Sequence, residues 1–189
     1  MEQYSFVEHS ESFYRKLVGN GALNVIKMII PDDKKDEDFA RKLLVEFRSW
    51  YKQYNGIKTR PYDGIPELLA CLRQKDIPLA VLSNKPHENT LDCINQFFGN
   101  NCFKAIRGFQ EGIPLKPDPS AALEIADMLN VDVSQIAMVG DSQADIQTAV
   151  NARMIPIAVL WGFRTAEDLA HLDCIKVRTV SELKSVLIK

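Results

Sequence analysis

The residues best suited to chemistry in this sequence are two aspartates that follow a short apolar run. Residues Ile136–Val139 are predicted to form a buried β-strand, because they are apolar and Gly140 ends the run. Asp141 comes directly after this strand, and Asp145 follows four residues later. Residues four apart on a helix share a face, so both carboxylates can point at one site. Two close carboxylates repel unless a cation neutralises them, and hard oxygen ligands favour Mg²⁺.

The same pattern has a structural alternative. An aspartate after a strand can cap the next helix, and an acidic residue in the first turn then favours the helix dipole. The chemical interpretation therefore depends on whether other polar residues follow neighbouring strands.

Two further polar segments are predicted to follow strands. Ser83 and Asn84 come after the apolar run Leu79–Leu82, and a serine hydroxyl with the N–H groups of a turn can bind an anion. Lys116 precedes Pro117, which favours an extended backbone at the lysine. This would hold its ammonium group on a stiff loop, where it can balance a phosphate or a carboxylate. A polar turn and a surface lysine are the structural alternatives.

The hydrophobic pattern predicts an α/β protein with two parts. Residues 1–58 are predicted to form a small helical subdomain, and residues 59–189 an α/β core. The helices are predicted at 7–18, 22–30, 36–54, 66–74, 87–98, 119–129 and 181–187, with one more after residue 142, and the strands at 79–82, 105–107, 136–139, 155–160 and 175–177. Alternating strands and helices with short connections predict a Rossmann-like parallel sheet. The carboxyl ends of its strands would bring Ser83, Lys116, Asp141 and Asp145 to one edge.

Composition and charge exclude several classes of protein. The formal net charge of −2 argues against a nucleic-acid partner or an anionic membrane surface. No stretch approaches 18 apolar residues, and the N-terminal residues have no signal-peptide pattern. The four cysteines show no Cys-x-x-Cys spacing, which is typical of reduced thiols and not of a zinc site. We therefore expect a cytoplasmic protein, whose oligomeric state the sequence leaves open.

Taken together, the polar segments resemble the haloacid dehalogenase (HAD) superfamily of phosphatases, especially phosphoglycolate phosphatase-like hydrolases with a helical cap. Residues 81–85, 115–119 and 139–145 resemble the second, third and fourth motifs of the superfamily, residues 18–22 the glycine turn of the cap, residues 62–65 the junction of cap and core, and residues 161–164 the loop after the next strand. This resemblance implies a HAD-like core with residues 1–58 as cap. It also implies Mg²⁺-dependent hydrolysis of a small phosphorylated metabolite, such as phosphoglycolate.

The resemblance also implies a role for each candidate residue. Ser83 and Asn84 would bind the phosphate group, and Lys116 would neutralise its charge, so that Ser83 and Lys116 take part in catalysis. Asp141 would bind Mg²⁺, with Asp145 as a supporting residue or a second ligand.

The first motif of the superfamily, Asp-x-Asp-Gly-Thr, has no match in the sequence. Asp36 and Asp38 have the bare spacing, but they open a predicted helix and are interpreted as first-turn acidic residues. In the superfamily this motif ends the first core strand, which lies between the strands expected here at 79–82 and 136–139. The core is thus expected to lack that strand, and each orphaned backbone group would cost about 1–3 kcal/mol. We expect the two strands to close up, another segment to fill the space, or the sequence to belong to a longer protein.

Without the first motif, the chain lacks the aspartate that would form a phosphoenzyme. We therefore expect little or no phosphatase activity, because removing a covalent nucleophile costs several orders of magnitude in rate. One alternative is a non-catalytic protein that binds phosphate or has a regulatory role. Another is a different HAD chemistry, that of the sugar-phosphate mutases or of the dehalogenases, which need no magnesium. Fold resemblance alone does not identify the substrate.

Overall fold

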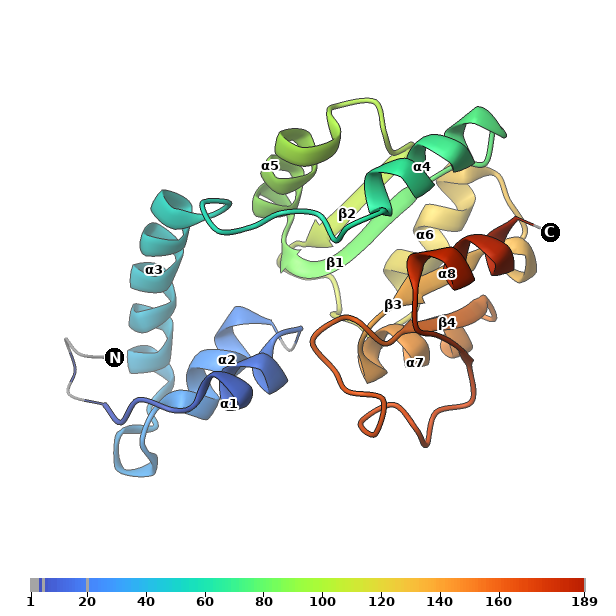
Figure 1. Ribbon diagram of the computed structural model, residues 1–189. Helices are drawn as coiled ribbons and strands as arrows, with labels where there is room; N and C mark the ends of the chain where they lie inside the picture. Colours follow the sequence, from blue (N-terminus) through green and yellow to red (C-terminus); the bar gives the residue numbers. More distant parts are fainter. Residues whose placement is uncertain (1–3, 5, 20, 189) are drawn as a thin grey trace. The chain divides into compact units, whose positions relative to one another are not determined.

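The computed structural model of the chain describes residue 4, residues 6–19 and residues 21–188. The chain divides into two compact units, Met1–Thr59 and Arg60–Lys189 (Figure 1). Within the described residues, no helix is both long enough and apolar enough to cross a membrane. The role of the first unit as a cap stays a prediction.

The first unit is built from helices, as the hydrophobic pattern predicts. Its helices are α1 (Glu11–Leu17), α2 (Ala22–Ile29) and α3 (Glu37–Tyr54), with a 3₁₀ turn at Asp32–Lys34. Ile26 and Ile30 pack with Ala40 and Leu44 to form its apolar core. This core holds α2 against α3, because each helix buries the apolar side of an amphipathic pattern.

Two helix starts in this unit are decided by side-chain caps. The first helix begins at Glu11 and not at residue 7, because the Ser10 hydroxyl accepts the N–H of Phe13 at 3.3 Å. Asp36 caps α3, and its Oδ2 accepts the N–H of Phe39 at 2.9 Å. Asp38 lies in the first turn, so the interpretation of this acidic run as a helix start is confirmed. Asn20, in the predicted glycine turn, lies outside the described residues.

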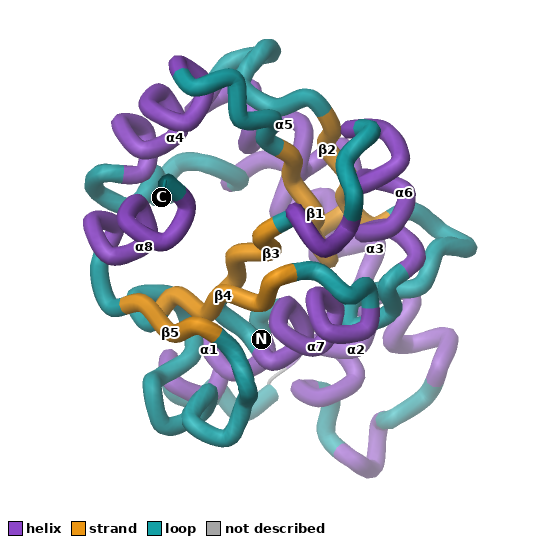
Figure 2. The backbone as a smooth tube through the Cα atoms, turned by 90° about the vertical axis from the view of Figure 1, so that its right-hand side faces the viewer, coloured by secondary structure: helices purple, strands orange, loops and turns teal. Residues whose placement is uncertain are grey.

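The second unit alternates helices and strands. Its elements are α4 (Ile65–Gln74), β1 (Ala80–Pro86), α5 (His87–Phe98), β2 (Ala105–Phe109), α6 (Ser120–Leu129), a 3₁₀ turn at Val133–Gln135, β3 (Ala137–Gly140), α7 (Gln143–Asn151), β4 (Ile155–Val159), β5 (Ile175–Val177) and α8 (Val180–Leu187). All strand pairs are parallel. The α/β class and the parallel pairing are therefore confirmed (Figure 2).

The strands form two sheets where the hydrophobic pattern predicts one. One sheet has the order β1-β2 and the other β3-β4-β5. No described strand pairs with the second edge of β1 or of β3. The two strands have thus not closed up on each other, and no described strand fills the space between them. Val139 of β3 is 40% exposed, although its apolar strand is predicted to be buried.

Helices pack on the strands through apolar clusters. Leu68 of α4 and Leu183 of α8 pack with Ile157 and Val159 of β4 and Val177 of β5. A second cluster, rich in alanine, joins α6 to α7 and includes Ala122, Ala126, Ala149, Ala152 and Met154, with Leu82 and Met138 packed against it. Small side chains let these helices approach closely. The second cluster therefore contacts both β1 and β3, the strands that carry the candidate site.

Candidate functional site

An ion pair between Lys116 and Asp145 is the centre of the candidate site. The Lys116 Nζ lies 2.6 Å from Asp145 Oδ1, and only 13% and 9% of the two side chains are exposed. The same ammonium donates to the carbonyl of Leu82 in β1 at 3.2 Å. Lys116 thus joins the first sheet to the helix that follows β3, which confirms its predicted proximity to Asp145.

Asn84 fixes the backbone at Lys116. Its Oδ1 accepts the Lys116 N–H at 2.9 Å, and its Nδ2 donates to the Lys116 carbonyl at 3.3 Å. Asn84 is only 8% exposed. The Lys116–Pro117 peptide is cis. These contacts show Asn84 positioning the lysine, and its predicted role in substrate binding stays a prediction.

Asp145 is held by the start of α7. Ser142 is the N-cap of this helix, and Asp145 completes a capping box with it. The Asp145 Oδ2 accepts the Ser142 hydroxyl at 2.6 Å and the N–H groups of Ser142 and Asp141 at 3.0 and 3.2 Å. Asp141 therefore precedes the helix, whereas the spacing argument places both aspartates on it. The two residues meet through the turn and not through a shared helix face.

Gly140 is required by the space that Asp145 takes. A Cβ atom added at Gly140 would lie 2.2 Å from the Cβ of Asp145 and 2.3 Å from its Cγ. Real Cβ atoms do not come this close, so a larger residue would displace the carboxylate. The glycine at the end of β3 thus leaves the space that the Asp145 side chain occupies.

The contacts of Asp145 lower its pKa. Burial by itself raises the pKa of this carboxyl group. The charge and hydrogen bond of Lys116, together with the hydrogen bonds from Ser142, outweigh burial and hold the pKa of Asp145 below the ordinary value of 3.8. Asp145 is therefore ionised at neutral pH.

This direction predicts how stability depends on pH. A carboxyl group whose pKa is lowered by folding stabilises the folded state fully above its unfolded pKa, and loses this contribution as the pH falls through the folded pKa. The difference in unfolding free energy between wild type and Asp145→Asn is thus expected to be constant from pH 7 to about pH 5 and to shrink below about pH 4. Urea denaturation across this range measures it. A difference that grows on acidification would contradict the assigned direction.

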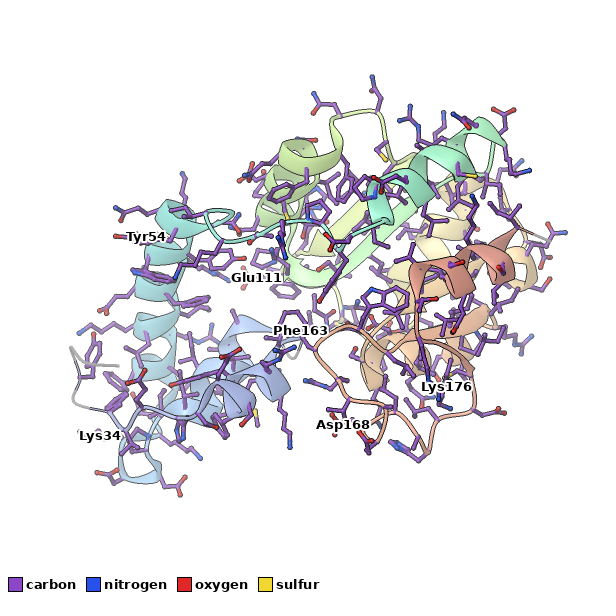
Figure 3. All side chains as sticks on the ribbon, in the orientation of Figure 1. Lys34, Tyr54, Glu111, Phe163, Asp168 and Lys176 are labelled. Carbon is purple, nitrogen blue, oxygen red and sulfur yellow. The ribbon has the colours of Figure 1, made fainter. Side chains whose placement is uncertain are left out.

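Asp141 has a different environment. Its Oδ2 accepts the N–H of Phe163 at 2.6 Å. Figure 3 labels Phe163 in the loop that follows β4. The Oδ1 of Asp141 accepts no hydrogen bond from the described residues. Asp141 is half-buried. A carboxylate oxygen without a hydrogen bond suits Mg²⁺, which proteins commonly bind through one or two carboxylates with waters and substrate phosphates. Among the described residues, no group of three or more histidine, cysteine or acidic side chains forms a complete metal site.

Ser83 lies in β1 beside this site. The strand extends to Pro86, so Ser83 and Asn84 lie within it and not after it. The pairing with β2 shifts between Leu82 and Pro86, and the Ser83 Oγ accepts the N–H of Lys85 at 3.1 Å. The polar turn predicted at Ser83 and Asn84 is therefore wrong, and both residues belong to the irregular end of β1.

Hydrogen bonds thus connect Asn84, Lys116, Asp145 and Asp141. Within the part of the chain that the structure describes, Ser83 is joined to them only along β1. Ser142 and Phe163 were not predicted as site residues. The Ser-x-x-Asp spacing of a capping box could have identified Ser142. The main-chain N–H of Phe163 leaves no signal in the sequence, because every residue except proline carries one.

A family model described as haloacid dehalogenase-like hydrolase matches residues 1–159. A phosphoglycolate phosphatase of Neisseria meningitidis is 30% identical over 159 residues, which cover 82% of this chain and 68% of the relative. A phosphoglycolate phosphatase of Mesorhizobium japonicum is 30% identical over 183 residues, which cover 92% and 81%.

Solved structures agree with these relatives. The crystal structure of a protein assigned as a phosphoglycolate phosphatase, from Lactobacillus delbrueckii subsp. bulgaricus, superposes with a TM-score of 0.90 at 28% identity. The superposition covers 98% of this chain and 87% of that chain. The architecture of the two units is therefore shared with known proteins over nearly the whole described chain.

Proposed function

The chain belongs to the haloacid dehalogenase-like hydrolase family, and we propose that the site around Lys116 and Asp141 binds the phosphate group of a small phosphorylated metabolite together with Mg²⁺. Phosphoglycolate is the substrate that the names of the relatives suggest, and we propose it or a metabolite of similar size. A cytoplasmic location is part of the same proposal.

The observation that supports this proposal most is the buried ion pair of Lys116. An ammonium group has three N–H donors. Two of them reach Asp145 and the Leu82 carbonyl, and the third has no partner among the described residues. It could donate a charge-assisted hydrogen bond to a phosphate oxygen. Because Asp145 keeps the lysine in place, the donor is positioned before the phosphate arrives.

Two other groups have the chemistry to complete the site. The Ser83 hydroxyl accepts the Lys85 N–H, and its own O–H could donate to a second phosphate oxygen. The Oδ1 of Asp141 would bind the metal ion, and Asp145 would support the site through Lys116. When bound, Mg²⁺ would neutralise part of the negative charge of the bound phosphate group.

The printed sequence contains no Asp-x-Asp-Gly-Thr segment. Asp36 and Asp38, which have the bare spacing, begin α3 in the first unit. We propose that the 189-residue chain binds phosphate and Mg²⁺ but does not hydrolyse phosphate esters, because the aspartate nucleophile of the family is absent.

Binding without turnover can be tested directly on this chain. Isothermal titration is expected to show that inorganic phosphate binds in the presence of Mg²⁺, while p-nitrophenyl phosphate shows no Mg²⁺-dependent hydrolysis above background. The Ser83→Ala variant is expected to raise the Kd for phosphate about tenfold or more, since a hydrogen bond to a charged group contributes about 1.5–3 kcal/mol.

Ser185→Ala is the matched control, because this hydroxyl lies on α8 and donates to the Ser181 carbonyl. Its phosphate affinity is expected to equal that of wild type. If the wild-type chain does not bind phosphate, the proposed phosphate site is refuted. Hydrolysis that Asp141→Asn abolishes would refute the proposed inactivity and leave the site in place.

A further inference from the structure

The loop that follows β4 contacts the side chain of Asp141, whereas Asp145 contacts its main-chain N–H. In the second sheet Gly140 pairs with Ala158, so the segment after β4 leaves the sheet at the same end as Asp141. The N–H of Phe163 donates to Asp141 Oδ2 at 2.6 Å, a short bond to a charged acceptor. The Asp141 carboxylate thus has one oxygen fixed by main chain.

Gly162 makes this contact possible by leaving space. A Cβ atom at Gly162 would lie 2.2 Å from Asp141 Oδ2, 2.3 Å from its Cβ and 2.5 Å from its Cγ. Gly162 is not among the glycines with positive φ, so the requirement for glycine comes from the close approach and not from backbone strain. Two separate features thus favour the position of the Asp141 carboxylate: the hydrogen bond from the Phe163 N–H and the space left at Gly162.

We propose that Gly162 and the main-chain N–H of Phe163 are positioning groups for Mg²⁺ binding: they hold Oδ2 of Asp141 so that Oδ1 faces the metal. This inference rests on the metal site proposed above and deepens it. Groups that orient a metal ligand typically change metal affinity about 10–100-fold when they are lost. The side chain of Phe163 takes no part in this contact.

Two variants disturb the contact of this loop with Asp141 in different ways. Gly162→Ala fills the space that Asp141 occupies, whereas Phe163→Pro removes the N–H donor without adding an atom at position 162. Both are expected to raise the Kd for Mg²⁺ about 10–100-fold. Phe163→Ala keeps the main-chain N–H and is the matched control, with a Kd for Mg²⁺ within about twofold of wild type.

Trp161 provides a local reporter. It packs against the cluster of Leu68 and Val159, next to Gly162. The sequence has two tryptophans, and the other, Trp50, lies on α3 and is 57% exposed. In a Trp50→Phe background, the fluorescence of Trp161 on titration with Mg²⁺ reports the loop alone, and isothermal titration gives the affinity independently.

The measurements separate a positioning role from a merely structural one. The metal-free affinity for inorganic phosphate is expected to stay close to wild type in Gly162→Ala and in Phe163→Pro, while the affinity for Mg²⁺ falls in both. Equal Mg²⁺ affinities in wild type, Gly162→Ala and Phe163→Pro would overturn this inference and leave the metal site standing. If wild type binds no Mg²⁺ at all, the metal site of the proposed function is refuted, and this inference with it.

Discussion

Replacing Asp145 by asparagine is expected to lower the free energy of unfolding by about 3–5 kcal/mol, because it leaves the charge of Lys116 largely buried without a counter-ion. The substitution also weakens the capping box, since Asp145 Oδ2 accepts three hydrogen bonds from the turn at the start of α7. A typical domain has a total stability of about 5–15 kcal/mol, so a loss of this size is readily seen. Urea denaturation followed by circular dichroism at pH 7 measures it.

The surface ion pair of Arg107 and Glu124 is a matched control. Its shortest N–O distance is also 2.6 Å, but 25% and 46% of its side chains are exposed. Glu124→Gln is expected to cost about 0–1 kcal/mol, because water screens an exposed pair. If Asp145→Asn lowers the free energy of unfolding no more than Glu124→Gln does, the ion pair of Lys116 and Asp145 stabilises the fold no more than a surface pair.

A double-mutant cycle separates the contribution of the Lys116–Asp145 ion pair to stability from that of the capping box. Lys116→Met removes the charge that Asp145→Asn leaves buried, so the double variant is expected to be destabilised by less than the sum of the single variants. Residues in direct contact show coupling of about 0.5–3 kcal/mol. Additive effects would mean that Asp145 stabilises the fold through Ser142 alone.

Asp141→Asn is expected to raise the Kd for Mg²⁺ at least about 100-fold. The loss of a group that merely orients a metal ligand costs about 10–100-fold, so the loss of the ligand charge itself should cost more. Asparagine keeps the size of the side chain and an oxygen that can accept the Phe163 N–H. The free energy of unfolding is therefore expected to change by less than about 1 kcal/mol, in contrast to Asp145→Asn.

Isothermal titration with Mg²⁺ checks this expectation, with Asp132→Asn as the control for the change of one charge. Asp132 is exposed and accepts the N–H of Ser134 at 2.8 Å in the turn before β3. Its substitution is expected to leave the affinity for Mg²⁺ unchanged. Equal losses in Asp141→Asn and Asp132→Asn would indicate that only net charge matters, and would argue against a metal site at Asp141.

Much of the fold follows from local patterns in the sequence. The amphipathic run of α3 has a period that fits a helix, and the short apolar runs of β3 and β4, which turn residues bound, favour buried strands. The alternation of strands and helices after residue 60 then leads to parallel pairing. The proximity of Lys116 to Asp145 could be predicted for the same reason, because the carboxyl ends of parallel strands open on one side.

The division of the strands into two sheets could not be read from any single strand. Each strand of a parallel sheet has the same apolar pattern whichever neighbour it pairs with. Only the folded chain shows that β1 pairs with β2 and that β3 pairs with β4.

The different roles of the two aspartates were also decided by tertiary structure. The sequence by itself predicted that two carboxylates, a lysine and a serine would lie near the ends of parallel strands, and the structure connects the lysine and the two carboxylates. Asp145 is the buried partner of Lys116, while Asp141 accepts a hydrogen bond from the Phe163 N–H through Oδ2. The physical reason is that the environment of a carboxylate depends on donors from distant segments, and spacing along the chain does not encode those.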